Sequence, residues 1–288
     1  MEKTYHEIVE TKLVDGVKVH YEYYYHENHL NRPVIVLIHG FVSSTYSFRY
    51  LIPLLVKHYP VLAVDLPGFG QSEKSTSFVY SFHNYAQLIF TILTMLKIDR
   101  VVPVGHSMGG QVGLYMAKLK PILVEKVVLL SSSGYLKRAK WKFRYASYIP
   151  LAPHMVKRWF VKRNYKDALT YVVHNKTIVN DDTVSEYAKA FEDDQFFHSL
   201  IRILRHREGD LSADELNEIK QPVLILWGKY DKVIPTQIGK RLQLDIPNAK
   251  IFIFDETGHL VTEERPKEAA EQIIEFLDGL SADPSSKI

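Results

Sequence analysis

Short, continuous apolar runs alternate with amphipathic helical segments along most of the chain. Each run consists mainly of Val, Ile and Leu, as in a strand that is buried on both faces of a sheet. The segments between them carry apolar residues at helical spacing, as in Phe82 to Leu96. Such alternation implies right-handed crossovers, and therefore a mostly parallel sheet with helices on both faces. The runs are Val34–Ile38, Val61–Asp65, Val101–Val104, Lys126–Ser131, Val223–Trp227 and Lys250–Phe254.

The alternation is preceded by a hairpin and interrupted once. Residues Tyr5–Val14 and Val17–Tyr25 are strand-like, and the Asp15-Gly16 pair between them is a strong two-residue turn signal. Between about residues 134 and 218 strand signals are few and helical ones are several. We therefore expect an α/β core domain of residues 1–133 and 219–288, into which a helical cap of residues 134–218 is inserted.

Composition excludes several classes of protein. The chain contains no cysteine, so a disulfide framework, a thiolate metal site and a thiol nucleophile are all excluded. The net charge of +3 is too small to argue for a nucleic-acid partner. Residues Met1 to Glu10 are polar and no run approaches the length of a transmembrane helix, so we expect a soluble, cytoplasmic protein. We expect a monomer or homodimer with no cofactor and, since no histidine pair shows ligand spacing, no metal.

The sequence Gly105-His106-Ser107-Met108-Gly109 lies where an apolar run meets a helical pattern. A serine hydroxyl becomes a useful nucleophile on a tight turn, beside a base and beside backbone N–H groups that can receive an oxyanion. The flanking glycines tolerate the strained backbone of such a turn. Because a short motif also occurs by chance, the rest of the chain must supply the partners of Ser107.

Candidate partners follow two of the apolar runs. A serine nucleophile requires a histidine base, and the histidine requires a carboxylate that holds its tautomer. Asp231 lies just past the run that ends at Trp227, and His259 just past the run that ends at Phe254. The carboxyl ends of parallel strands converge on one crevice, so we expect Ser107, Asp231 and His259 to meet there.

Other residues compete for these roles. Asp255 also ends a strand, but it is so close to His259 in sequence that we expect it to pack under that loop. His106, adjacent to Ser107 on a sharp turn, is expected to point elsewhere. We expect His39 to shape its loop through hydrogen bonds, and Asp65 to form a turn at the end of its strand.

The chain resembles the α/β-hydrolase family through HGF at 39–41, DLPGFGQS at 65–72, GHSMGG at 105–110, WGKYD at 227–231 and GH at 258–259. The order of serine, aspartate and histidine also matches that family. The resemblance implies Ser107 as nucleophile, His259 as base and Asp231 as the orienting acid. It further implies an oxyanion hole formed by the backbone N–H groups of Phe41 and Met108. We also place four residues in the substrate pocket: Gly40, His106, Val233 and Leu260.

The expected cap begins with a basic and aromatic stretch that has no carboxylate before Asp167. We favour two amphipathic helices whose aromatic side chains face the site and whose cations face water. Attraction of an anionic substrate, or of an anionic membrane surface, is the less favoured interpretation. The cations are Lys137, Arg138, Lys140, Lys142, Arg144, Lys157, Arg158, Lys162 and Arg163, and the aromatics are Trp141, Phe143, Tyr145, Tyr148, Trp159 and Phe160.

The identity of the nucleophile narrows the expected reaction. Similar hydrolases that open epoxides or remove halide use an aspartate at this position, whereas this chain has Ser107. We therefore expect a serine hydrolase that cleaves carboxylic esters of small to medium hydrophobic substrates through an acyl-enzyme. Thioesters, lactones and perhydrolysis would use the same parts.

Two alternatives remain open. A carbon–carbon hydrolase of ring-fission products also pairs GxSMGG with a helical cap, although that branch usually has asparagine and tryptophan where this chain has His106 and Leu260. The other alternative is a signalling or binding protein that keeps the triad for a small ligand.

Overall fold

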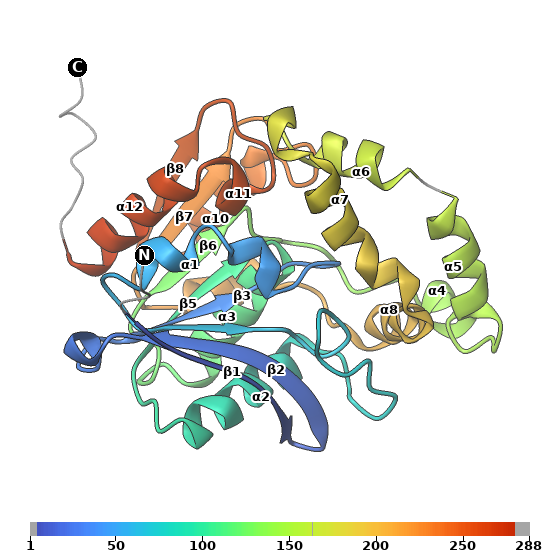
Figure 1. Ribbon diagram of the computed structural model, residues 1–288, viewed down its shortest axis with the longest axis horizontal. Coiled ribbons are helices and arrows are strands. Elements are labelled where there is room, and N and C mark those ends of the chain that lie inside the picture. Colours follow the sequence, from blue (N-terminus) through green and yellow to red (C-terminus); the bar gives the residue numbers. More distant parts are fainter. Residues whose placement is uncertain (1–4, 163, 280–288) are drawn as a thin grey trace.

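The structure, a computed structural model, describes residues 5–162 and 164–279, and at its centre lies one twisted sheet (Figure 1). The sheet has eight strands in the order β1-β2-β4-β3-β5-β6-β7-β8. The β1–β2 and β2–β4 pairs are antiparallel, and all other neighbours are parallel, which confirms the predicted fold class. The strands are β1 (His6–Val14), β2 (Val17–Tyr25), β3 (Val34–Ile38), β4 (Val61–Val64), β5 (Val101–His106), β6 (Val127–Leu130), β7 (Val223–Gly228) and β8 (Ala249–Phe254).

The β1–β2 hairpin forms as the sequence predicts. Val14 lies opposite Val17, and the two residues between them both have positive φ, 49° at Asp15 and 81° at Gly16. A type I′ turn, whose twist matches that of the flanking strands, requires positive φ at both central positions. Asp-Gly adopts this conformation at low energetic cost.

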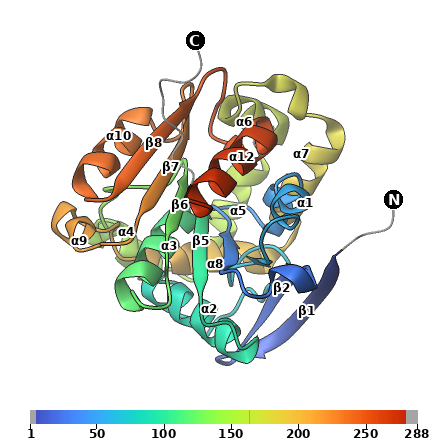
Figure 2. The same cartoon turned by 90° about the vertical axis from the view of Figure 1, so that its left-hand side faces the viewer.

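Helices cover both faces of the sheet (Figure 2). On one face lie α2 (Phe82–Met95), α3 (Met108–Leu119) and α10 (Thr236–Asp245), and on the other α1 (Ile52–Leu55) and α12 (Pro266–Leu277). Side chains of β3 alternate between the two layers, with Val36 and Ile38 in the first and Ile35 and Leu37 in the second. The continuous apolar runs are therefore explained by burial on both faces.

The sequence pattern from about Tyr46 to His58 predicts a single helix, which the structure shows to be interrupted. The structure has a 3₁₀ turn, η2 (Thr45–Phe48), and then the short helix α1, with Pro53 in its first turn. Proline has no backbone N–H, so a helix running on through residue 53 would lack one hydrogen bond of its ladder. The segment folds as two short turns for this reason.

Helices fill the segment between β6 and β7, and most of them lie at one side of the sheet in Figure 1. The last long helix, α8, packs into the core through Phe196 and Phe197. The elements are α4 (Trp141–Ala146), α5 (Ala152–Val161), α6 (Tyr165–Val172), η3 (Lys176–Ile178), α7 (Asp181–Ala188), η4 (Lys189–Glu192), α8 (Asp194–His206) and α9 (Ala213–Asn217). Within the described residues, no helix combines the length and apolarity needed to cross a membrane.

Candidate active site

Ser107 occupies the turn between β5 and α3 in a strained backbone conformation, with φ 52° and ψ −116°. The chain reverses so tightly that a Cβ at Gly109 would lie 2.1 Å from the carbonyl oxygen of Ile38. A Cβ at Gly105 would lie 2.3 Å from the carbonyl oxygen of Gly109. Both glycines are therefore required by close approach of the backbone, and the crowding holds the serine in its unusual conformation.

The neighbouring strand β6 holds this turn. The backbone N–H of Ser107 donates to the carbonyl of Leu130 at 2.9 Å, and the N–H of Ser133 donates to the carbonyl of Ser107 at 3.0 Å. A backbone conformation of this kind costs about 1–3 kcal/mol and persists only when its surroundings fix it. These two bonds supply part of that restraint.

Asp231 and His259 are in direct contact. The Oδ2 atom of Asp231 lies 2.8 Å from Nδ1 of His259, and both residues are buried. Its Oδ1 atom accepts the N–H groups of Val233 at 2.8 Å and Ile234 at 2.9 Å. The carboxylate therefore accepts a hydrogen bond from Nδ1–H, which leaves Nε2 of His259 free to act as a base.

The loops that carry these two residues are packed against each other. A Cβ at Gly228 would lie 1.9 Å from the carbonyl oxygen of Gly258, so β7 and the histidine loop approach as closely as backbones can. The backbone N–H of His259 also donates to the carbonyl of Val172 at 3.0 Å. The end of α6 thus helps to set the position of the histidine.

Glu264, at the end of the short helix α11 (Val261–Glu264), joins the histidine loop to the helical segment. Its carboxylate accepts the backbone N–H of Gly258 at 2.8 Å, of His174 at 2.9 Å and of Asn175 at 2.8 Å. Burial raises the pKa of this carboxyl, and the three bonds oppose that rise. Sequence reasoning missed Glu264 because its partners are backbone groups, which no sequence motif marks.

His106 contacts the histidine that we expect to be the base. Its Nε2–H donates to the carbonyl of His259 at 3.0 Å, and the two ring centroids are 4.9 Å apart. Burial, and then the nearby His259 ring, lower the pKa of His106 to about 3, so the ring is neutral at pH 7. No hydrogen bond joins Ser107 Oγ to the His259 ring in the described residues; such bonds are often long in enzymes without substrate.

His39 holds the HGF loop in place. Its Nε2 accepts the backbone N–H of Leu66 at 2.9 Å, so Nδ1–H donates to the carbonyl of Gly40 at 2.7 Å. Burial lowers the pKa of this ring as well. With both nitrogens occupied, His39 serves the loop in the way expected from the sequence.

The two rival aspartates have other partners. Asp255 is exposed and pairs with Lys229 at 2.6 Å, so it does not pack under the histidine loop as expected. The buried Asp65 accepts the backbone N–H groups of Thr45 and Gln71, both at 2.7 Å, which agrees with a structural role in its turn. Of the aspartates considered, only Asp231 contacts His259.

Ser107 opens into an apolar cavity of about 550 Å³ that Phe41, Met108 and Val233 also line. Gly40, His106 and Leu260, expected in the pocket, do not line it; Leu260 packs instead with Leu169 and Val173. The cavity lining therefore differs from the expectation at these three positions: a Cβ at Gly40 would lie 3.0 Å from the Cβ of Ser107, and the His106 ring is turned to the backbone of His259. The helical segment supplies much of the remaining wall, with Leu136, Lys137, Leu200, Ile203, Leu204 and Arg207.

The backbone N–H groups of Phe41 and Met108 are available at this cavity. Neither donates a hydrogen bond to another group in the described part of the chain. Met108 begins α3, and the first N–H groups of a helix have no carbonyl partner within it. The partial positive charge at the N-terminus of α3 would further stabilise an oxyanion that forms beside the N–H group of Met108.

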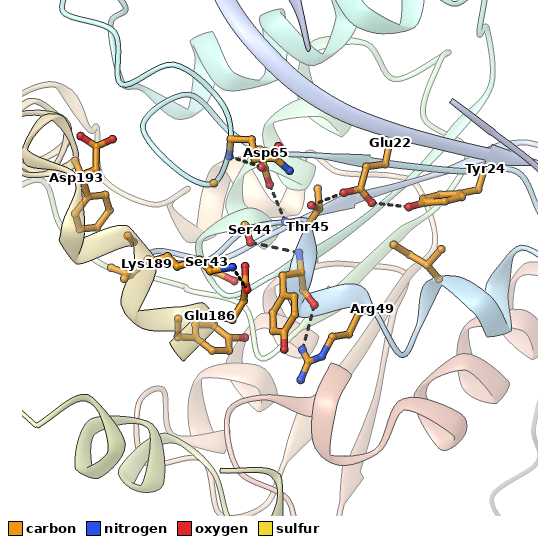
Figure 3. Close-up of a pocket in the computed structure, with 18 of the residues that line it drawn as sticks. Glu22, Tyr24, Ser43, Ser44, Thr45, Arg49, Asp65, Glu186, Lys189 and Asp193 are labelled. Atoms are coloured by element: carbon orange, nitrogen blue, oxygen red, sulfur yellow. Dashed lines mark hydrogen bonds and ion pairs between the residues drawn. The ribbon is translucent and has the colours of Figure 1, made fainter. Parts of the chain in front are cut away.

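A second cavity, of about 660 Å³, is polar and does not include Ser107 (Figure 3). Its charged side chains are partnered within the protein. Glu22 accepts the hydroxyls of Tyr24 at 2.6 Å and Thr45 at 2.9 Å, and Arg49 pairs with Glu263 at 2.7 Å. The remaining pairs are Asp65 with Thr45 and Gln71, Glu186 with Lys189, and Asp193 with Lys74. This network stabilises the surrounding loops, and most of the charge at the cavity is compensated within it.

Within residues 5–162 and 164–279, no group of three or more His, Asp or Glu side chains is placed to hold a metal ion.

A family model described as alpha/beta hydrolase fold matches residues 33–266. The chain belongs to the α/β-hydrolase family. This α/β-hydrolase is 45% identical over 264 residues to the uncharacterized hydrolase YugF of Bacillus subtilis (strain 168), covering 92% of this chain and 96% of that protein.

Two further comparisons concern enzymes with named substrates. The α/β-hydrolase is 28% identical over 258 residues to the 2-hydroxy-6-oxo-2,4-heptadienoate hydrolase of Pseudomonas putida, covering 84% of this chain and 88% of that enzyme. The solved structure of a meta-cleavage product hydrolase from Pseudomonas fluorescens IP01 matches with a TM-score of 0.77 and 22% identity, covering 94% of this chain and 98% of that one. At 22% identity, the structural similarity shows that the two proteins share a fold.

Proposed function

We propose that this α/β-hydrolase cleaves carboxylic esters of small to medium hydrophobic substrates, with Ser107 as nucleophile. The observation that carries the proposal is the 2.8 Å contact between Asp231 and His259, beside a strained serine turn that opens into an apolar cavity. Strain at a turn and a histidine held in one tautomer are the features that activate a serine hydroxyl.

The reaction follows from these positions. Ser107 Oγ attacks the ester carbonyl carbon while Nε2 of His259 takes the hydroxyl proton. The N–H groups of Phe41 and Met108 receive the oxyanion. When the tetrahedral intermediate collapses, the bond to the alcohol breaks and His259 returns the proton to the leaving oxygen. A water molecule then attacks the acyl-enzyme by the same route and releases the acid.

The cavity supports an apolar substrate. Its volume of about 550 Å³ lies in the range of sites for small molecules. Phe41, Leu200 and Ile203 line it, and Lys137 and Arg207 are its cationic side chains. An acyl chain of moderate length would bury its methylene groups there, at about 0.8 kcal/mol for each group. We further propose that residues 134–218 form a cap over the site and that the protein acts in the cytoplasm.

Hydrolysis of a carbon–carbon bond is the second candidate, and it is favoured by one observation. The relative from Pseudomonas putida is named for a 2-hydroxy-6-oxo-dienoate substrate. Such a substrate carries a carboxylate, for which Lys137 or Arg207 would be the partner in this cavity.

A screen of p-nitrophenyl esters of graded acyl length, run beside a 2-hydroxy-6-oxo-dienoate, tests the proposal. We expect ester turnover that rises and then falls with chain length, and that is absent in Ser107→Ala. Turnover of the dienoate alone would favour the carbon–carbon hydrolase. If neither class reacts while a small molecule raises the melting temperature, the protein is a binding protein that retains the fold.

A further inference from the structure

Aromatic side chains stand out from the surface of α4, α5 and the link between them. Trp141, Phe143, Tyr145 and Tyr148 are 63%, 61%, 70% and 62% exposed. The expectation that the aromatics of this stretch face the active site was therefore wrong for these four. We call this region the α4–α5 surface; it comprises their side chains together with those of Ile149, Leu151 and Met155, which are also exposed.

Cations alternate in sequence with the residues of the α4–α5 surface, and the stretch that carries them contains no carboxylate. No Asp or Glu occurs between Gly134 and Lys166. Of the cations expected there, Arg163 lies outside the described residues, and Lys157 pairs with Asp194. Six others are exposed and form no ion pair within the described part of the chain, namely Lys137, Arg138, Lys140, Lys142, Arg158 and Lys162.

We propose that the α4–α5 surface docks this protein on an anionic lipid bilayer, with its aromatic and aliphatic side chains in the headgroup region and its cations at the lipid phosphates. Helices that lie in a membrane interface carry Lys and Arg beside Trp, Phe and Leu. Clusters of four to eight such cations are typical of segments that bind anionic leaflets. Both requirements are met here by neighbouring residues of two short helices.

The position of the surface gives the docking a consequence for the active site. In Figure 1, α4 and α5 lie at the edge of the molecule, away from the sheet. The residues just before α4, Leu136 and Lys137, line the cavity that contains Ser107. A docked protein would therefore hold one wall of that cavity next to the bilayer, from which an apolar substrate could enter.

The chemistry of the surface favours lipid over two other partners. A second copy of the chain would bring two unpaired cationic clusters together across a two-fold contact, which like charges oppose. A nucleic acid would use the cations and could stack on the aromatics. It offers little to Ile149, Leu151 and Met155, which are 54%, 64% and 66% exposed, whereas the bilayer interface accepts them.

Flotation of the full chain with vesicles tests the docking, and it does so independently of the proposed ester hydrolysis. We expect binding to vesicles of equal parts phosphatidylglycerol and phosphatidylcholine at low salt, and little binding to phosphatidylcholine alone. Lys140→Glu/Lys142→Glu/Arg158→Glu should lower the partition coefficient by about 100-fold. Trp141→Ser/Leu151→Ser/Met155→Ser should lower it by about tenfold.

The matched control is Lys57→Glu/Lys240→Glu/Lys250→Glu, which makes the same change of charge at exposed lysines elsewhere. We expect this control to keep at least half of the wild-type binding, and all variants to keep their melting temperatures. Equal binding to both vesicle types, or equal loss in the control, would overturn the proposal. The proposal would also be overturned if the wild type failed to bind vesicles and instead formed a dimer or an RNA complex that these substitutions abolish.

Discussion

The contact between Asp231 and His259 determines which imidazole nitrogen carries the proton. Asp231 accepts three hydrogen bonds, two from backbone N–H groups and one from the imidazole, so its position is fixed from both sides. A carboxylate held in this way keeps the proton of His259 on Nδ1. The opposite nitrogen is then the one that can take the proton of a nucleophile.

Replacing Asp231 by asparagine should slow the reaction without unfolding the protein. The amide would fit the same space, but its N–H₂ group could face Nδ1 and so favour the wrong tautomer of His259. We expect kcat to fall by about 10³- to 10⁴-fold, with an unchanged melting temperature. The matched control is Asp255→Asn, on the exposed partner of Lys229, which should keep wild-type kinetics. The opposite ranking of the two variants would contradict the assignment.

His106 should make the stability of the protein depend on pH. Its pKa falls from 6.5 to about 3 on folding, because the ring is buried. Between those values the unfolded chain binds a proton that the folded chain does not, so the free energy of unfolding decreases as the pH falls. In His106→Asn, we expect this dependence to be shallower by up to about 1.4 kcal/mol per pH unit.

Urea unfolding of both proteins between pH 6.5 and 4 measures this difference. The exposed His83→Asn is the control, and its slope should match that of the wild type. Equal slopes in His106→Asn and the wild type would show that His106 does not carry the effect.

At the scale of residues, the sequence predicts the contact between Asp231 and His259 better than it predicts the lining of the cavity. Ser107, Asp231 and His259 could be singled out because chemistry at strand ends follows from chain order and residue type. Their neighbours could not be placed by the same reasoning. Gly40, His106 and Leu260 are close to the site in sequence, but successive side chains of a turn or strand point in different directions.

At the scale of elements, the histidine loop is held by the helical segment as well as by the sheet. Three hydrogen bonds join residues 172–175 to residues 258–264: one is accepted by the carbonyl of Val172 and two by the carboxylate of Glu264. A fourth, also accepted by Glu264, lies within the histidine loop. The end of α6 and the short helix α11 are thus coupled through backbone groups. A shift of the helical segment would move His259 relative to Ser107.

Glu264→Gln should disturb that coupling. The carboxylate accepts from three backbone N–H groups, whereas an amide offers one oxygen and would direct its own N–H₂ at the remaining donors. We expect a loss of about 1–3 kcal/mol in the free energy of unfolding. We also expect kcat to fall by about 10- to 100-fold, with a smaller change in KM, because the base is displaced.

Glu268→Gln, on the exposed face of α12, is the matched control and should change neither quantity. If Glu264→Gln lost stability but retained kcat at a temperature where it is folded, Glu264 would have a structural role alone.

The elements of the sheet could be predicted from sequence, and the helical segment only in its type. A run such as Val34–Ile38 fits only a strand inside a sheet that is covered on both faces, because all of its side chains are apolar. The aromatic residues of α4 could be placed in two ways, since Trp and Tyr are compatible with a pocket wall and with an exposed interface. The interruption at Pro53 shows the same limit, because helical spacing continues across a residue that ends the hydrogen-bond ladder.

Across the whole molecule, the carboxyl edge of the sheet and the segment after β6 enclose one cavity. Asp231 contacts His259 at that edge, Ser107 lines the cavity, and Leu136 and Lys137 line it just before the chain enters the α4–α5 surface. The central claim is that Ser107 is a nucleophile activated by His259.

Labelling with a fluorophosphonate, followed by peptide mapping in a mass spectrometer, tests this claim most directly. We predict a single phosphonyl adduct on Ser107 in the wild type, none in Ser107→Ala, and labelling slowed by about 100-fold or more in His259→Ala. An adduct on another residue, or wild-type labelling rates without His259, would contradict it.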